Sequence, residues 1–373
     1  MALEQIIKER IRRHGPISFR SFMDMALYFP ELGYYMNNGT EIGRRGDFFT
    51  AANLHSAFGW ALAGQIQQMW ELMKKPECFH IIEYGGGGGL LCFDIMRSLK
   101  DKEIFDSISY VIVERNPYFQ VKQKEKLTDF SNKVIWHADT KDFPQVLGCV
   151  ISNELLDSFA VNLVFAKKHK IEEVFVDENF KEIFFSPSIG VSDYFREFNI
   201  SIPLDLSVGY RTEINLGLRD WLLEISGFLS EGFILTIDYG YTAWEYYAPE
   251  RNRGTLMCYH RHSVNENPYI NIGAQDITAH VNFTSLMQWG LLMGFECLGY
   301  CPQGTFLVSL GIDEFLAETA HTEDFLFQAA KIKRLITGGG MGQSHKVMVQ
   351  YRGKGIPVLR GFSIRNSVSS LSL

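Results

Sequence analysis

The spacing of apolar residues changes near residue 75, and this change gives a first division of the chain. Before it, apolar positions recur at helical intervals. This spacing predicts a helix that ends at His14, a second helix over Phe19–Tyr28, and a long helix from Leu54 to Met73. Ser18 has the position and the side chain of an N-cap for the second helix. Residues 1–74 are therefore expected to form an N-terminal helical segment that carries a loop rich in Gly, Asn and aromatic residues.

From residue 75 to residue 160, short apolar runs alternate with stretches of helical spacing. The predicted strands are Phe79–Glu83, Tyr110–Glu114, Val134–Trp136 and Cys149–Asn153, and the predicted helices are Leu90–Leu99 and Tyr118–Leu127. Short strands that are almost entirely apolar and separated by helices are typical of a parallel sheet covered on both faces. The pattern predicts an α/β fold, and this stretch is expected to be its cofactor-binding half.

The regular alternation stops after Asp157. Residues 161–210 hold two β-like runs and then a turn-rich stretch, which we interpret as an insertion or cap. Residues 211–353 resume the α/β pattern as the second half of the core, and the Ser-rich tail at 354–373 is expected to be mobile. The elements predicted here are the helices Asn215–Phe228, Phe283–Met293 and Ile312–Leu335 and the strands Phe233–Ile237, Phe295–Tyr300 and Lys346–Tyr351.

Composition excludes several classes of function. The chain has 373 residues, a formal charge of -7 and a sequence pI of about 5.8, which disfavours a nucleic-acid partner. The six cysteines are scattered without the spacing of a zinc site, so no metal is expected. No apolar run approaches the roughly 20 residues of a membrane span. The N-terminus lacks the features of a secretory signal, so the expected location is the cytoplasm, or the mitochondrial matrix for a processed eukaryotic homologue.

Polar residues stand where four predicted strands end. They are Glu83, Glu114, Asn153 with Glu154, and Asp238. Because parallel strands deliver their carboxyl ends to one edge of the sheet, these side chains are expected to meet in one ligand site.

The glycine run 85–89 identifies the kind of ligand. A dinucleotide-binding turn needs a third glycine or an alanine, but that position falls on Leu90 or Leu91. The alternative pattern E-x-G-x-G-x-G is met by Glu83, Gly85, Gly87 and Gly89. This pattern predicts S-adenosylmethionine as the cofactor, with the turn against its aminoacyl and ribose parts.

Two further acids extend this predicted site. Glu114 lies 114 − 89 = 25 residues after the last glycine and is expected to accept hydrogen bonds from the ribose hydroxyls. Asp139, which follows the third strand, is placed to accept from the adenine amino group. A flexible glycine loop with Glu114 as a solvated strand end is the structural alternative.

The stretch from Asn153 to Asp157 follows the fourth strand and is expected to face the reactive methyl group. Methyl transfer is an in-line displacement, so the enzyme must orient the nucleophile and exclude water. If the acceptor is a guanidinium, Glu154 is suited to hold it through charge-assisted hydrogen bonds. Asn153 belongs to the same predicted catalytic group, and Asp157 either makes a second contact or caps the next helix.

At this point several linked motifs resemble one family, the MidA-type methyltransferases. The motifs are residues 29–35, 42–50, the glycine turn, residues 153–157, 238–240, 253–256 and 275–281. The resemblance implies a class I, Rossmann-like fold with seven strands, mostly parallel with an antiparallel edge, plus an N-terminal helical segment and a central insertion. For the mitochondrial members it also implies symmetric dimethylation of a protein arginine, with a respiratory complex I subunit as partner.

The same resemblance implies further site residues. Asp47 and Thr50 would touch the cofactor or the substrate, and the remaining substrate-binding candidates are Phe48, Phe49, Asp238, Tyr239, Gln275, Asp276 and His280. This chain departs from the family at Tyr84 and Gly86, where relatives more often have Leu or Ile and Ala or Pro. The departure affects the tightness of the turn.

Other functions remain open from the sequence alone. A methyltransferase acting on a small molecule or on RNA would use the same core. An assembly or binding factor that kept the fold and lost turnover is the alternative from a different class.

Overall fold

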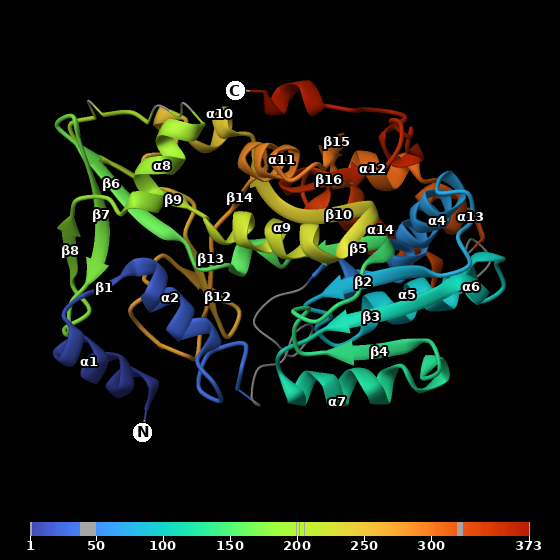
Figure 1. The fold of residues 1–373 in the computed structure, drawn as a ribbon, viewed down its shortest axis with the longest axis horizontal. Helices are drawn as coiled ribbons and strands as arrows, with labels where there is room; N and C mark the ends of the chain where they lie inside the picture. The colour runs from blue at the N-terminus through green and yellow to red at the C-terminus, as the bar shows by residue number, and fades with distance from the viewer. Residues whose placement is uncertain are drawn as a thin grey trace.

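A seven-strand path forms the central sheet of the computed structural model (Figure 1). The structure describes residues 2–37, 50–198, 200, 202–204, 206–318 and 324–372. The strand order is β15-β16-β10-β5-β2-β3-β4, and the short strand β14 pairs with β10. The bounds are β2 Phe79–Tyr84, β3 Ile108–Val113, β4 Val134–His137, β5 Val146–Asn153, β10 Leu229–Tyr241, β14 Val281–Asn282, β15 Glu296–Pro302 and β16 His345–Arg352.

Five neighbouring strands of this path, β10, β5, β2, β3 and β4, run parallel. Strand β16 is antiparallel to both β10 and β15. The expected α/β fold, mostly parallel with an antiparallel edge, is therefore confirmed.

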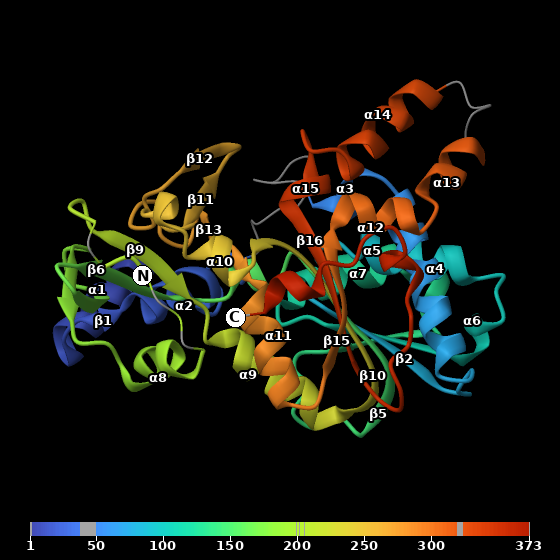
Figure 2. The same cartoon turned by 90° about the horizontal axis from the view of Figure 1, so that it is seen from above.

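Both faces of this sheet are buried, as the apolar strands predict. Successive strand residues belong to two different cores: Ile81, Cys149, Phe233 and Val347 to the first, and Ile82, Val150, Ile234 and Met348 to the second. Helices α4 Ala57–Leu72, α5 Leu90–Leu99, α12 Gln303–Ser309 and α14 Phe325–Ile336 contribute to the first core. Helices α8 Ile189–Glu197, α9 Gly217–Phe228 and α11 Phe283–Leu292 contribute to the second. Figure 2 shows α9 and α11 together beside β15 and β10.

A second lobe lies beside the sheet and is built from three parts of the sequence (Figures 1 and 2). Its larger sheet joins the N-terminal strand to the insertion through an antiparallel pairing of Ile17 with Val176. Its elements are α1 Leu3–His14, β1 Ile17–Ser18, α2 Phe19–Tyr28, β6 Asn162–Lys167, β7 Lys170–Val176, β8 Glu182–Phe185, β9 Tyr210–Ile214, β11 Met257–His260, β12 Ser263–Asn265 and β13 Asp276–Thr278. The N-terminal helices and the insertion thus share one core, whereas the sequence divided them into separate segments.

Two predicted helices differ in the structure. The helix predicted over 54–73 starts later, as α4, and a separate short helix, α3 Ala51–Leu54, precedes it. Extended His55 separates the two helices and accepts the Ala57 N–H on its ring nitrogen. The helix predicted over 312–335 appears as α13 Ile312–Glu318 and α14, and residues 319–323 between them are outside the described residues. The other short helices are α6 Ile104–Ser107, α10 Ala243–Tyr246 and α15 Met341–Ser344, and α7 Pro117–Lys126 flanks β4.

The C-terminal tail packs on the core, which corrects the expectation of a mobile tail. Leu359, Phe362 and Leu371 are buried. The Arg360 guanidinium donates to the Gly64 carbonyl, and the Gly361 N–H donates to Gln65 Oε1. Serine-rich composition suggested mobility, but three apolar residues spaced along the tail find buried positions. Across the described part of the chain, none of the helices has the length and apolarity that crossing a bilayer requires.

Candidate active site

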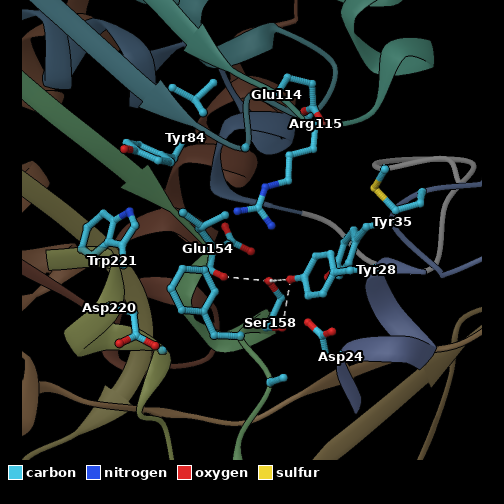
Figure 3. Close-up of a pocket in the computed structure, with 18 of the residues that line it drawn as sticks. Asp24, Tyr28, Tyr35, Tyr84, Glu114, Arg115, Glu154, Ser158, Asp220 and Trp221 are labelled. Atoms are coloured by element: carbon cyan, nitrogen blue, oxygen red, sulfur yellow. Dashed lines mark hydrogen bonds between the residues drawn. The ribbon is translucent and has the colours of Figure 1, made fainter. Parts of the chain in front are cut away.

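One large cavity, of about 1030 Å³, lies between the carboxyl edge of the sheet and the second lobe. The ends of β2, β3 and β5 form one wall, and α2 and β7 form the opposite wall. In Figure 3, Glu114, Arg115 and Glu154 lie on the sheet side, and Asp24, Tyr28 and Tyr35 approach from the second lobe. The cavity therefore brings together the strand ends that the sequence predicted to meet.

The glycine turn begins directly after β2. Gly85, Gly87 and Gly89 have φ values of 68°, 51° and 76°, a region that glycine adopts without the steric cost of a side chain. A Cβ on Gly85 would also lie 2.9 Å from Leu155 Cδ1. The three left-handed positions are those of the pattern E-x-G-x-G-x-G.

Gln123 on α7 holds this turn, and no motif in the sequence predicted this role. Its fully buried side chain donates to the Gly87 carbonyl at 2.9 Å and to Glu114 Oε2 at 3.3 Å. Its oxygen accepts from the Trp136 indole at 3.0 Å. No signal in the sequence marks Gln123, because the burial of a single amide in a helix is not visible there.

The acids at the ends of β3 and β4 line the cavity differently. Glu114 is half-buried, and burial raises its pKa, although the Asn116 N–H donates to it at 2.9 Å. Asp139 is more exposed and accepts from the Lys141 N–H at 3.2 Å. Both carboxylates keep a face toward the cavity.

Glu83 lies deeper than the other acids of the turn, with 3% of its surface exposed. Burial raises its pKa to about 7, although the Tyr110 hydroxyl donates to it at 2.7 Å. Glu83 therefore titrates near neutral pH, unlike an exposed glutamate.

Glu154 follows β5 in a left-handed conformation with φ of 49°, which is unusual for a residue with a side chain. Its N–H donates to the Ile237 carbonyl, and its Oε1 accepts from the Ala51 N–H at 2.8 Å. Thr50 caps the short helix that starts at Ala51. The backbone of two neighbouring elements thus fixes the direction of this carboxylate.

His345, the first residue of β16, is a second neighbour of Glu154, and no motif in the sequence predicted it. Its Nε2 lies 3.8 Å from Glu154 Oε2, and both side chains are 7% exposed. This Nε2 has no hydrogen-bond partner among the described residues. The catalytic candidate Asn153 lines the cavity as well, and its buried Oδ1 has no partner there either.

Asp157, Asp238 and Tyr239 lie behind the cavity wall. Asp238 is fully buried and accepts the N–H groups of Leu155, Leu156 and Asp157 at 2.9–3.3 Å. The Tyr239 hydroxyl donates to Asp157, whose pKa burial raises to about 7. The structure therefore gives Asp238 and Tyr239 a place in the support of the 154–157 turn rather than in the cavity lining.

Gln275, Asp276 and His280 are also away from the cavity lining. Gln275 is buried and donates to the Asn267 carbonyl, and Asp276 accepts from the Tyr35 hydroxyl at 2.8 Å. Burial, with Arg251 nearby, lowers the pKa of His280 to about 4. None of these three residues is among the described residues that line the cavity, where the resemblance placed them.

Asp47, Phe48 and Phe49 lie outside the described residues. No group of three or more His, Cys, Asp or Glu in the described part of the chain is arranged to hold a metal ion.

The residues present fit the cofactor that the sequence predicts. The glycine turn opens its backbone to the cavity, and Gln123 braces the turn and Glu114 together. Asn153 Oδ1, on a residue of the same cavity, remains able to accept a hydrogen bond.

Known proteins with similar sequences and structures bear on this site. The sequence profile of a family described as S-adenosyl-L-methionine-dependent methyltransferase matches residues 61–301. A crystal structure of a Burkholderia thailandensis protein bound to S-adenosyl-homocysteine superposes with a TM-score of 0.89 at 29% identity. The superposition covers 99% of this chain and 96% of the Burkholderia thailandensis chain.

Named relatives include the protein arginine methyltransferase NDUFAF7 homolog, mitochondrial, of Drosophila melanogaster. It is 25% identical over 336 residues, which are 82% of this chain and 74% of the relative. Protein arginine methyltransferase NDUFAF7, mitochondrial, of Bos taurus is 27% identical over 339 residues, which are 82% of this chain and 72% of the relative.

Proposed function

Because the chain belongs to the family of S-adenosylmethionine-dependent methyltransferases, we propose that it transfers the methyl group to an arginine of a protein. Family membership confirms the predicted MidA-type resemblance, the enzyme class and the cofactor. The relatives named as protein arginine methyltransferases support this choice of acceptor.

The observation that carries the proposal is the charge of the cavity. Among the described lining residues, eight are Asp or Glu and three are Arg. Glu154 presents its carboxylate at the sheet edge. A guanidinium, which stays protonated in solution, gains charge-assisted hydrogen bonds in such surroundings.

We assign the cofactor to the sheet-side wall, between the glycine turn, Glu114, Asp139 and Asn153. When bound, S-adenosylmethionine supplies an electrophilic methyl group on a sulfonium sulfur. The second-lobe wall, with Tyr28 and Asp24, is left for the acceptor. Tyr28 is fixed there by its hydroxyl, which lies 2.8 Å from the Ser158 hydroxyl (Figure 3).

Glu154 has two tasks in this proposal. It orients the guanidinium so that one nitrogen faces the methyl carbon, and it accepts the proton that this nitrogen releases as the new C–N bond forms. From Glu154 Oε2 the proton can pass to His345 Nε2, which lies 3.8 Å away. The chain's own groups therefore provide both orientation and an exit for the proton.

The acceptor is tested by labelled methyl transfer. The protein is incubated with cofactor carrying a radioactive methyl group and with arginine-containing proteins, and the label is located by amino-acid analysis. We expect label in methylarginine and its loss when the acceptor arginine is changed to lysine. Label in RNA or in a small molecule, with none in methylarginine, would overturn the proposal. A complex I subunit as the acceptor and a cytoplasmic location remain predictions from the sequence.

A further inference from the structure

A second buried carboxylate, Glu173, lines the same cavity from the opposite wall. It lies on β7, inside the second lobe, and 1% of its surface is exposed. The strand ends that hold the cofactor in the proposed function belong to the central sheet. Glu173 is therefore a polar group of the cavity that the methyl-transfer site does not use.

The hydrogen bonds of Glu173 fix its position without neutralising it. Asn162 Nδ2 donates to Oε1 at 2.7 Å, and the Ser188 N–H donates to Oε2 at 2.7 Å. Among the described residues, no Lys, Arg or His forms an ion pair with it. Burying a carboxylate without a cation is costly, and among the described residues two hydrogen bonds offset that cost.

A second observation points to a ligand at the same place. Asn162 is 6% exposed and also lines the cavity, and its Oδ1 is buried without a hydrogen-bond partner. Its orientation is set because its NH₂ group is occupied by Glu173. The wall therefore holds a carboxylate and an amide oxygen, both acceptors, and the amide oxygen has no donor among the described residues.

Of the arginines that line the cavity, Arg20 is paired with an acid other than Glu173, and Arg10 donates to Met25 Sδ. Arg20 Nη2 lies 3.3 Å from Asp220 Oδ2. The positive charges of Arg20, Arg115 and Arg10 act on Asp24, whose pKa burial nevertheless raises. Arg115 projects into the cavity from the end of β3 (Figure 3). Among the described residues, the ion pair of these arginines is therefore with Asp220, and the acid on which all three charges act is Asp24 rather than Glu173.

Phe175 supplies an apolar surface beside this carboxylate. It is two positions after Glu173 on β7, so both side chains leave the same face of the strand, and both line the cavity. A long basic side chain lays its methylene groups on such a surface while its charged end reaches an acid.

We propose that Glu173 and Asn162 form a second pocket, which binds the side chain of a lysine or arginine that flanks the methylated arginine in the acceptor protein. The proposal rests on the proposed function, because it assumes a polypeptide acceptor. Acceptors would then carry two basic residues, one reaching Glu154 and one reaching Glu173.

Peptide binding to the unmodified protein tests the pocket first. The peptides carry a central arginine and one lysine at a varied position, and their matched controls have alanine in place of that lysine. Binding is measured by fluorescence anisotropy with S-adenosylhomocysteine present. We expect at least one lysine position to bind about tenfold more tightly than its alanine control. Equal binding at every position would overturn the pocket, whether or not any peptide is methylated.

The variant Glu173→Gln links that preference to the residue. It removes the charge and keeps an oxygen able to accept from Asn162 or Ser188. We expect the lysine preference to disappear while affinity for S-adenosylhomocysteine and the melting temperature stay close to those of the unchanged protein. Glu172→Gln is the matched control, because Glu172 pairs with Lys170 and lies outside the cavity lining. Loss of the preference in Glu172→Gln but not in Glu173→Gln would contradict the assignment.

The two proposals fail in different ways. If peptides show the Glu173-dependent preference but none gains methylarginine, the pocket stands and arginine methylation is wrong. If peptides gain methylarginine without any lysine preference, arginine methylation stands and the pocket is wrong.

Discussion

The Ala51 N–H donates to Glu154 Oε1 over 2.8 Å, which ties the first residue of α3 to the turn that follows β5. Glu154 also holds a left-handed backbone conformation, with φ of 49°. A strained conformation of this kind persists only where the surroundings over-determine it, and such residues cluster at functional sites. The carboxylate is therefore held ready in a fixed direction before an acceptor arrives.

The raised pKa of Glu83 predicts how stability depends on pH. An acid with a pKa of about 7 when folded and 4.5 as its ordinary value holds its proton more tightly in the folded protein. Its contribution therefore lowers the free energy of unfolding as pH rises from about 4.5 to 7. Glu83→Gln removes this contribution, so its stability relative to the unchanged protein should rise by about 2.5 kcal/mol between pH 5 and pH 8.

Denaturant unfolding at the two pH values measures that difference. Glu77→Gln, at an exposed site just before β2, is the control and should follow the unchanged protein. Parallel pH profiles for Glu83→Gln and the unchanged protein would show that Glu83 is ionised at neutral pH.

Two glycines of the turn, Gly85 and Gly88, are predicted to differ in how much stability the protein loses when each is changed to alanine. In Gly85→Ala, a residue with a side chain must adopt a positive φ, and its Cβ lies too close to Leu155. We therefore expect the free energy of unfolding to fall by about 1–2 kcal/mol or more. Gly88→Ala should be nearly neutral, since its Cβ would meet no atom within 4 Å. Thermal unfolding without ligand compares the two, and equal melting temperatures would argue against this turn geometry.

Gln123 is predicted to control cofactor affinity without touching the acceptor. Gln123→Leu leaves the Gly87 carbonyl and the Trp136 indole without their partner, at a cost of about 1–3 kcal/mol. We expect affinity for S-adenosylhomocysteine, measured by calorimetry, to fall about tenfold. Gln67→Leu on α4 serves as a surface control. Unchanged affinity in Gln123→Leu would exclude Gln123 as a support of the site.

The packed tail predicts a stability effect far from the cavity. Phe362 is 7% exposed and lies with its ring centroid 5.2 Å from that of Phe306. Phe362→Ala should cost about 3 kcal/mol, whereas Ile364→Ala, at a side chain that is 60% exposed, should cost less than about 0.5 kcal/mol. Similar unfolding curves for the two variants would show that the tail does not pack on the core and is mobile, as its composition suggested.

The sequence was informative where structure depends on near neighbours. Helix α5 has the bounds that its apolar spacing predicts, and the left-handed glycines are those of the expected pattern. The polar strand ends meet because parallel strands share one carboxyl edge.

The parts that the sequence missed depend on distant pairings. Ile17 pairs with Val176, and no local pattern indicates that the first strand completes a sheet of the insertion. Asp238 was expected to face a substrate because it ends a strand. Its carboxylate instead accepts the backbone N–H groups of residues 155–157 behind the cavity wall. Gln123 and His345 join the site only through tertiary packing.

The most direct test of the account separates binding from turnover at Glu154. Glu154→Gln keeps an oxygen that can accept from the Ala51 N–H and loses the charge that holds a guanidinium and takes up its proton. Calorimetry with S-adenosylhomocysteine and labelled methyl transfer into methylarginine are measured on the same preparation. We predict affinity within about threefold of the unchanged protein and transfer lowered about a hundredfold or more. Methylarginine formed by Glu154→Gln at the unchanged rate would contradict the account.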